Sequence, residues 1–224
     1  MSVSDFLTLI TDTDTENMKL DFRLYLITDR KLFSSSDAML EAIEKALQGG
    51  AKAVQLREKD LMTRELLGLA YRMRALTAKY SAKFFVNDRV DIALAVDADG
   101  VQLGRKSIPV QAARKASDGR LLVGVSTHSV QEAQQAEADG ADFITLGPLY
   151  ETPSKMQYGR PIGIHLLNEA ARNCMIPVFA IGGITIGRIE EVLAQGASGT
   201  ALISAILTAE DIKKTTEEFV RKLS

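Results

Sequence analysis

Three polar side chains follow an apolar run at alternate positions. Gln55, Arg57 and Lys59 stand in the segment QLREK. Alternation along a strand places these three side chains on one side, while Leu56 and Glu58 point to the other. Two cations and an amide then face the same place, and this spacing favours a binding function. The alternative is a solvated strand end whose charges pair with nearby carboxylates.

A carboxylate follows the next apolar run. Asn87 and Asp88 come after the segment KFFV and precede VDIALAV, which has a helical pattern. Taken alone, these two residues are typical of a helix N-cap. Asp88 could instead hold Mg²⁺, a hard cation that takes oxygen ligands and leaves room for substrate phosphates. Both interpretations are open at this point.

A histidine and a serine follow a later apolar run. Ser126 and His128 stand in the segment VSTHS. His128 is the side chain best able to exchange a proton near neutral pH. Ser129 is a plausible cap for the helical pattern that follows it, and a lone histidine at a helix start is more often structural than catalytic.

Hydroxyl groups and a lysine occupy the longest gap between apolar runs. The segment GPLYETPSK contains Thr152, Ser154 and Lys155. Hydroxyls, backbone N–H groups and an ammonium together suit phosphate oxygens, which accept hydrogen bonds from all three. A turn rich in Thr, Pro and Ser with no ligand would have the same composition.

Small residues follow the last two apolar runs, in AIGGIT and ALISAI. A glycine such as Gly183 lets the backbone come close to a ligand, and a helix that starts near Ile203 and Ser204 offers N–H donors to an anion. In β/α barrels, phosphate is commonly bound after strands seven and eight. We therefore expect Gly183, Ile203 and Ser204 to form a phosphate cradle, with plain turn glycines as the alternative.

A regular alternation of apolar runs and amphipathic stretches positions all these segments. The runs predict eight strands, at Leu24 to Thr28, Ala53 to Arg57, Lys83 to Asn87, Gly100 to Gln102, Leu121 to Ser126, Asp142 to Leu146, Pro177 to Ile181 and Ser198 to Leu202. They are near-continuously apolar, as strands buried on both faces are. The stretches between them have helical spacing. The pattern predicts an α/β fold, a single eight-stranded parallel β/α (TIM) barrel, with a doubly wound open sheet as the alternative.

Length and composition limit the protein class. A chain of 224 residues predicts one domain, with a barrel over residues 21–224 and an N-terminal arm or extra helix over residues 1–20. The formal charge of -2 gives no global field that would attract nucleic acid or an anionic membrane. Cys174 is the lone cysteine, and no segment resembles a signal peptide or a membrane span. We expect a cytoplasmic protein.

Seven segments of the chain together resemble the thiamin phosphate synthase and TenI superfamily. They span about residues 24–208 and read YLITDR, VQLREKD, VNDRVDIALAVDADGVQLG, GVSTHS, EADGADFITLGPLYETPSK, IPVFAIGGIT and GASGTALISAI. The resemblance implies a β/α barrel. The synthase branch joins hydroxymethylpyrimidine pyrophosphate to thiazole phosphate and releases pyrophosphate. The TenI branch includes a tautomerase that moves a proton on the thiazole phosphate.

The resemblance also implies a role for each candidate residue. The catalytic residues would be Lys59, Ser126 and Lys155, with His128 as the proton carrier of a tautomerase. Asp88 would be a Mg²⁺ ligand. The residues that bind the phosphate and pyrophosphate substrates would be Gln55, Arg57, Asn87, Thr152, Ser154, Gly183, Ile203 and Ser204.

The chain departs from the family pattern after the fourth strand. The synthase pattern there ends in an aspartate that is the second Mg²⁺ ligand, whereas this chain has Arg105, Lys106 and Ser107. Two cations and a hydroxyl should weaken Mg²⁺ binding, because the ion prefers negative oxygen ligands. We therefore expect a synthase with a weakened Mg²⁺ site. The alternatives are a thiazole phosphate tautomerase and a non-catalytic thiamin phosphate binder.

Overall fold

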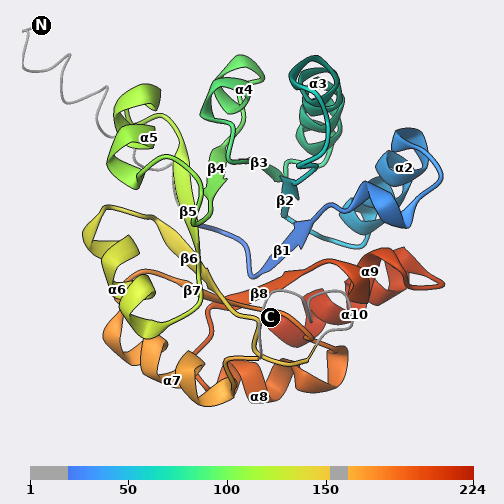
Figure 1. Cartoon of the computed structure of the whole chain (residues 1–224). Coiled ribbons are helices and arrows are strands. Elements are labelled where there is room, and N and C mark those ends of the chain that lie inside the picture. Colours follow the sequence, from blue (N-terminus) through green and yellow to red (C-terminus); the bar gives the residue numbers. More distant parts are fainter. Residues whose placement is uncertain (1–19, 152–160) are drawn as a thin grey trace, which may run out of the picture.

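Eight parallel strands close into a barrel. The computed structural model describes residues 20–151 and 161–224. Each strand pairs with the next, and β1 also pairs with β8, so the sheet has no free edge. Figure 1 looks along this barrel, with the strands at the centre and the helices around them. The strands are β1 (Leu24–Ile27), β2 (Ala53–Leu56), β3 (Lys83–Asn87), β4 (Gly100–Leu103), β5 (Leu122–Thr127), β6 (Phe143–Leu146), β7 (Val178–Ile181) and β8 (Gly199–Leu202).

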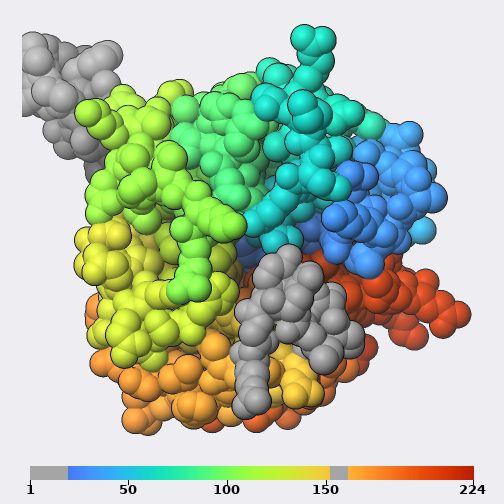
Figure 2. All heavy atoms as spheres, in the orientation of Figure 1, coloured from blue at the N-terminus to red at the C-terminus, as the bar shows by residue number. Residues whose placement is uncertain are grey.

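These bounds agree with the predicted strands to within one residue at each end. The predicted barrel is confirmed, and the open-sheet alternative is wrong because β1 and β8 are hydrogen-bonded to each other. Figure 2 shows the same face of the molecule, on which residues early in the chain (blue) adjoin residues late in the chain (red).

Alternate strand residues belong to two different cores. On β1, Leu24 and Leu26 pack in the layer beneath the helices, whereas Tyr25 lies inside the barrel. The inside is largely aromatic, with the rings of Tyr25, Phe85, Phe143 and Phe179 in edge-on contacts. Because both faces of each strand are buried, the strands need continuous apolar runs, which is the pattern that the sequence has.

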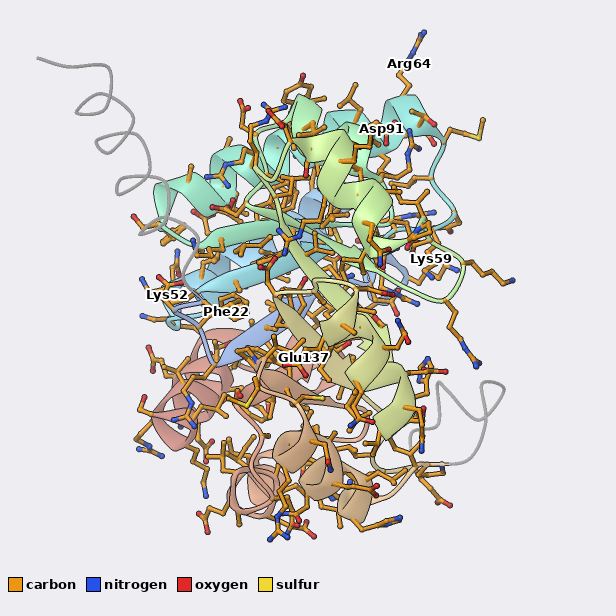
Figure 3. All side chains as sticks on the ribbon, turned by 90° about the vertical axis from the view of Figure 1, so that its left-hand side faces the viewer. Phe22, Lys52, Lys59, Arg64, Asp91 and Glu137 are labelled. Atoms are coloured by element: carbon orange, nitrogen blue, oxygen red, sulfur yellow. The ribbon has the colours of Figure 1, made fainter. Side chains whose placement is uncertain are left out.

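Phe22 covers the amino-terminal end of this interior. Its ring lies 5.3 Å from that of Phe179 and 5.6 Å from that of Tyr25, measured between centroids, and only 5% of the residue is exposed. In Figure 3, Phe22 and Lys59 lie on opposite sides of the barrel. One end is therefore filled by an aromatic side chain, and the other is left for polar residues.

Amphipathic helices surround the strands. In α2, Met39, Ile43 and Leu47 recur at helical spacing and are buried against the barrel, and the N-cap Ser35 accepts a hydrogen bond from Ala38 N. The helices are α2 (Ser36–Gln48), α3 (Thr63–Lys79), α4 (Val90–Ala95), α5 (Val110–Ser117), α6 (Val130–Ala138), α7 (Ile164–Asn173), α8 (Ile189–Ala194), α9 (Ser204–Leu207) and α10 (Ile212–Leu223), with short 3₁₀ turns η1 (Arg30–Leu32) and η3 (Ile186–Arg188).

The N-terminal arm or extra helix predicted over residues 1–20 falls almost entirely outside the described residues, which begin at Leu20. Leu20 itself packs against the aromatic interior. Within the described ranges, no helix is long and apolar enough to cross a membrane.

Candidate active site

A cavity of about 710 Å³ opens where the strands end. Its walls come mainly from the segments that follow β1, β2, β7 and β8, and this volume suits a small-molecule ligand. Of the predicted site residues that the structure describes, five line it, namely Arg57, Lys59, Gly183, Ile203 and Ser204. Residues more than 120 positions apart in the chain therefore meet in one cavity, because β2 and β8 both flank β1.

Two of the four cations that line this cavity among the described residues, Arg57 and Lys59, follow β2, and the others are Lys31 and Arg188. The strand ends at Leu56, so Arg57, Glu58 and Lys59 belong to the connection after it. Glu58, which strict alternation predicts on the opposite side from Arg57 and Lys59, lines the same cavity. Alternation does not extend past Leu56, because the period of two belongs to strand geometry.

A chain of hydrogen bonds links the ends of β2, β3 and β4 beside the cavity. Gln55 Nε2 donates to Asn87 Oδ1 (3.0 Å), and Asn87 Nδ2 donates to Asp88 Oδ2 (2.7 Å). Ser107 Oγ donates to Asp88 Oδ1, and Lys59 Nζ lies 3.9 Å from Asp88 Oδ2. The structure thus brings Asn87 and Asp88 next to Lys59, which lines the cavity, although neither of the two is itself a lining residue.

The side-chain amide of Gln55 has a buried oxygen that accepts no hydrogen bond from the described residues. Its Oε1 has no hydrogen-bond partner among the described residues, although the residue is only 1% exposed. A buried acceptor without a partner costs free energy, which a donor on a bound ligand would recover.

Asp88 does not cap a helix. The N-cap position of α4 is Arg89, which makes no side-chain capping bond, so the capping interpretation of Asn87 and Asp88 is wrong. The backbone of Asp88 has φ +62°, a left-handed conformation that residues other than glycine rarely adopt. Such strained residues cluster at functional sites, where surrounding contacts hold them in place.

The donors around Asp88 are compatible with a magnesium ion bound through few protein ligands. They comprise the Asp88 carboxylate and the Ser107 hydroxyl that contacts it. Within residues 20–151 and 161–224, no group of three or more His, Cys, Asp or Glu side chains is placed to hold a metal. Mg²⁺ is commonly bound by one or two carboxylates plus substrate phosphates, and this donor set fits that mode.

The three residues after β4 that depart from the family pattern, Arg105, Lys106 and Ser107, differ in their contacts. Arg105 pairs with Glu132 of α6, with its Nη2 at 3.0 Å from Oε1, and its side chain is 72% exposed. Lys106 is exposed as well. Ser107 alone of the three contacts Asp88, so the hydroxyl, and not the guanidinium, stands beside the carboxylate.

Ser126 belongs to a polar network at the end of β5. Its Oγ accepts a hydrogen bond from Gln102 Nε2 (3.1 Å) and lies 3.4 Å from Thr145 Oγ1. Below it, Tyr25 OH donates to Gln102 Oε1 (3.4 Å), and burial raises the pKa of Tyr25 well above its usual value. The network joins the aromatic interior to the polar end of the barrel.

His128 contacts the neighbouring strand end. Its Nδ1 lies 2.5 Å from the carbonyl oxygen of Gly147. Because a carbonyl oxygen can only accept, this hydrogen bond needs a proton on Nδ1. The backbone N–H of His128 donates to Glu132, and His128 is not among the residues that line the 710 Å³ cavity. Ser129 caps α6, as predicted, by accepting from Glu132 N.

The glycines after β7 lie close to the segment after β6. A Cβ on Gly182 would be 2.6 Å from Pro148 Cα, and one on Gly183 would be 2.7 Å from Tyr150 Cβ. Both residues also have positive φ angles, +94° and +68°. Glycine is required here by the backbone and by its neighbours, whether or not a ligand approaches.

Two residues of this region were missed by sequence analysis. Arg188 lines the cavity, donates from Nη1 to Gly183 O (2.5 Å) and lies over the Tyr150 ring, with Cζ 4.1 Å from the centroid. Burial and a hydrogen bond to Glu191 raise the pKa of Tyr150 to about 12. An arginine beside a helix start and a tyrosine in a loop have no sequence signal of their own.

Thr28 and Glu58 were also missed as site residues. Both are buried, and they form a hydrogen bond beside the cavity. The only signal was the presence of a glutamate between two cations in LREK. Thr152, Ser154 and Lys155, which were predicted to bind pyrophosphate, lie outside the described residues.

Comparison with known proteins identifies the family. A family profile described as thiamine monophosphate synthase matches residues 24–206. A relative from Geobacter sulfurreducens is 53% identical over 193 residues, 86% of this chain and 90% of the relative. The thiamine-phosphate synthase of Pyrococcus furiosus is 44% identical over 207 residues, 92% of this chain and 97% of that protein.

Solved structures agree with this result. Thiamine phosphate pyrophosphorylase from Pyrococcus furiosus superimposes with a TM-score of 0.82 at 43% identity, covering 90% of this chain and 95% of that one. A 3-hexulose-6-phosphate synthase, at 21% identity and a TM-score of 0.72, shares the fold alone. With a profile that spans every strand and relatives above 40% identity, the chain belongs to the thiamine monophosphate synthase family.

Proposed function

We propose that this protein is a thiamin phosphate synthase, which joins hydroxymethylpyrimidine pyrophosphate to thiazole phosphate and releases pyrophosphate. The observation that carries the proposal is one cavity whose walls include Arg57 and Lys59 after β2 and the Gly183 and Ser204 segments after β7 and β8. Two substrates with separate anionic groups need two such walls facing each other. The names of relatives at 42–44% identity support the same activity.

In the reaction, the bond between the pyrimidine methylene and the pyrophosphate oxygen breaks, and its electron pair leaves on pyrophosphate. The thiazole nitrogen then donates its lone pair to the resulting pyrimidine-stabilised cation, which forms the new C–N bond. No proton has to move. Catalysis therefore depends on positioning two substrates and on neutralising the charge of the leaving group.

The residues after β2 and β3 suit the leaving group. Arg57 and Lys59 supply positive charge to pyrophosphate, and the amide of Asn87 supplies a polar contact beside them. The unpaired Oε1 of Gln55 is the atom that would accept from a donor on the pyrimidine. Thr152, Ser154 and Lys155 are proposed as further pyrophosphate contacts on the family resemblance alone.

Asp88 and the adjoining Ser107 hydroxyl would hold Mg²⁺. The ion, when bound, offsets the negative charge of pyrophosphate. With a single carboxylate, most of its remaining ligands must be phosphate oxygens and water, so we propose weak binding in the absence of substrate. Lys59 Nζ, at 3.9 Å from Asp88 Oδ2, supplies part of the same positive charge from the protein itself.

The phosphate of the thiazole substrate is proposed to bind between the segments after β7 and β8. Gly183 allows a close approach of the backbone, and the first residues of α9, from Ser204, offer N–H groups that a helix leaves without internal partners. Ile203 is the N-cap residue of that helix. The tautomerase remains the alternative, and its proton carrier would be His128, whose Nδ1 contacts the Gly147 carbonyl oxygen.

The direct test is a synthase assay with purified protein. Hydroxymethylpyrimidine pyrophosphate and thiazole phosphate are mixed with Mg²⁺, and thiamin phosphate and pyrophosphate are quantified together. We expect the two products in equal amounts, and neither when thiazole phosphate is omitted. Proton exchange on the thiazole phosphate without any coupling would instead identify a tautomerase, and binding of thiamin phosphate without either reaction would identify a binder.

A further inference from the structure

A buried carboxylate stands between the two cations that follow β2 and lines the same cavity. Glu58 stands in the chain between Arg57 and Lys59, and its side chain is 2% exposed. Desolvation by burial raises the pKa of Glu58, and hydrogen bonds from Thr28 and Arg30 oppose that rise. A buried carboxylate lowers the stability of the fold relative to an apolar side chain of the same size. A role of Glu58 in function would offset this cost.

Among the described residues, the polar partners of the Glu58 side chain come from the segment after β1. Thr28 Oγ1 donates to Glu58 Oε1 at 2.6 Å. The backbone N–H of Arg30 donates to both carboxylate oxygens, at 3.1 and 3.2 Å, and Arg30 Nε lies 3.9 Å from Oε2. Glu58 thus connects two neighbouring strand ends through its side chain.

Thr28 extends this connection to Arg57. The Thr28 hydroxyl accepts a hydrogen bond from Arg57 N at 2.9 Å while it donates to Glu58, and the residue is fully buried. A hydroxyl has one proton, so donation to Glu58 leaves a lone pair directed at Arg57 N. The backbone of Arg57 and the side chain of Glu58 are therefore held by the same atom.

We propose that Glu58 is a positioning residue, which together with Thr28 holds the backbone of residues 57–59 so that the Arg57 and Lys59 cations face the pyrophosphate group. The proposal rests on the proposed synthase function. It assigns Arg57 and Lys59 to the ligand and Glu58, which stands between them, to the protein backbone. The two cations flank Glu58 in the chain, so a shift of its carboxylate moves both.

The test compares isosteric variants of the two partners. Glu58→Gln keeps the shape of the side chain and removes its charge, Thr28→Val removes the hydroxyl, and Thr28→Ser keeps it. Affinity for inorganic pyrophosphate is measured by calorimetry, and kcat and KM are measured for each substrate in the synthase assay. Thermal unfolding is recorded for every variant.

We expect Glu58→Gln and Thr28→Val each to weaken pyrophosphate binding and to lower kcat/KM for the pyrimidine substrate about tenfold, because small misplacements of binding groups are costly. Thr28→Ser should stay within about twofold of wild type, and KM for thiazole phosphate should not change. The double variant should lose little more than either single variant, since both act through one contact. Asp37→Asn is the matched control, because its carboxylate is exposed on α2 and pairs with Arg72.

Two results would overturn the proposal. The first is wild-type pyrophosphate affinity in folded Glu58→Gln or Thr28→Val. The second is a lower unfolding temperature accompanied by equal losses for both substrates, which would mean that Glu58 has a structural role only. Failure of the proposed synthase function can be distinguished from failure of the Glu58 proposal. In the first case, wild-type protein makes no thiamin phosphate, while the pyrophosphate affinities of wild type and variants can still be compared by calorimetry.

Discussion

The ammonium group of Lys59 lies at the cavity and 3.9 Å from the Asp88 carboxylate. If pyrophosphate departure is the chemical step, Lys59→Ala should lower kcat by about 10²-fold or more, since a charge contact that strengthens in the transition state contributes about 3 kcal/mol. Lys155→Ala is expected to do the same. Affinity for thiazole phosphate, measured by calorimetry, should remain nearly unchanged in both variants.

His128→Ala provides the comparison that separates a synthase from a tautomerase. In a synthase, loss of this imidazole should leave coupling largely intact, because coupling needs no proton transfer and the Nδ1 of His128 contacts the Gly147 carbonyl. Lys79→Ala serves as a charge control, since Lys79 pairs with Glu44 and its side chain is 62% exposed. A protein that loses activity with His128→Ala and keeps it with Lys59→Ala would contradict the synthase proposal.

The contact between Ser107 and Asp88 makes the magnesium proposal testable at the level of single residues. The double substitution Lys106→Glu and Ser107→Asp places a second carboxylate beside Asp88 and reverses the charge of the residue before it. We expect calorimetry without substrate to show tighter Mg²⁺ binding, because two carboxylates suit the ion better than one. Synthase activity at low Mg²⁺ should rise in parallel.

Lys106→Glu alone is the matched control for that experiment. Its side chain is exposed, and it leaves the oxygen donors next to Asp88 unchanged. If the double variant and this control bind Mg²⁺ equally well, Asp88 and residue 107 do not form one metal site, and the proposed ligand set is wrong.

At the scale of the elements, the short helix α9 provides the groups after β8 that are proposed to bind the phosphate of the thiazole substrate. Ser204 is its first residue and is exposed at the cavity. Ser204→Asp should weaken thiazole phosphate binding by about tenfold or more, because a carboxylate would face a phosphate among N–H donors. Calorimetry with thiazole phosphate measures the change directly.

Ser204→Asn separates charge from size at this helix. Its side chain resembles that of aspartate and is neutral, so affinity should remain much closer to wild type. Equal weakening by both substitutions would mean that bulk, and not charge, is responsible. Unchanged affinity in Ser204→Asp would remove α9 from the proposed phosphate site.

For the molecule as a whole, Phe22 connects the start of the described chain to strands on every side of the barrel. Its ring contacts those of Tyr25, Phe85, Phe143 and Phe179. Phe22→Ala should lower the free energy of unfolding by about 3 kcal/mol, the usual cost of removing a buried phenyl ring.

Urea denaturation measures that change, and Met175→Ala is the control because Met175 is 94% exposed. The Phe22 variant should keep its substrate affinities, since the ring lies at the end of the barrel opposite Lys59 (Figure 3). A decrease in the free energy of unfolding of less than about 1 kcal/mol would mean that the Phe22 ring contributes little to the packing of the barrel interior.

The sequence alone determined the α/β class and the position of most strand ends, whereas the pairing of β1 with β8 in the structure decided that the sheet closes. Both faces of every strand are buried, so the strands appear in the sequence as short apolar runs, and helical spacing identifies what lies between them. Residues at strand ends must then meet at one end of the barrel, which is why Arg57, Lys59, Gly183 and Ser204 could be placed together. These predictions depend on local periodicity, and local periodicity is visible without coordinates.

Only the tertiary structure decided how the charged groups between those runs pair. Glu58 pairs with Thr28, Arg105 with Glu132, and Ser107 with Asp88, in each case across separate segments of the chain. Alternation ends where a strand ends, so beyond Leu56 nothing local fixes the direction of a side chain. The pairing depends instead on the path of each connection and on which strands are neighbours around the closed barrel, and both are properties of the whole fold.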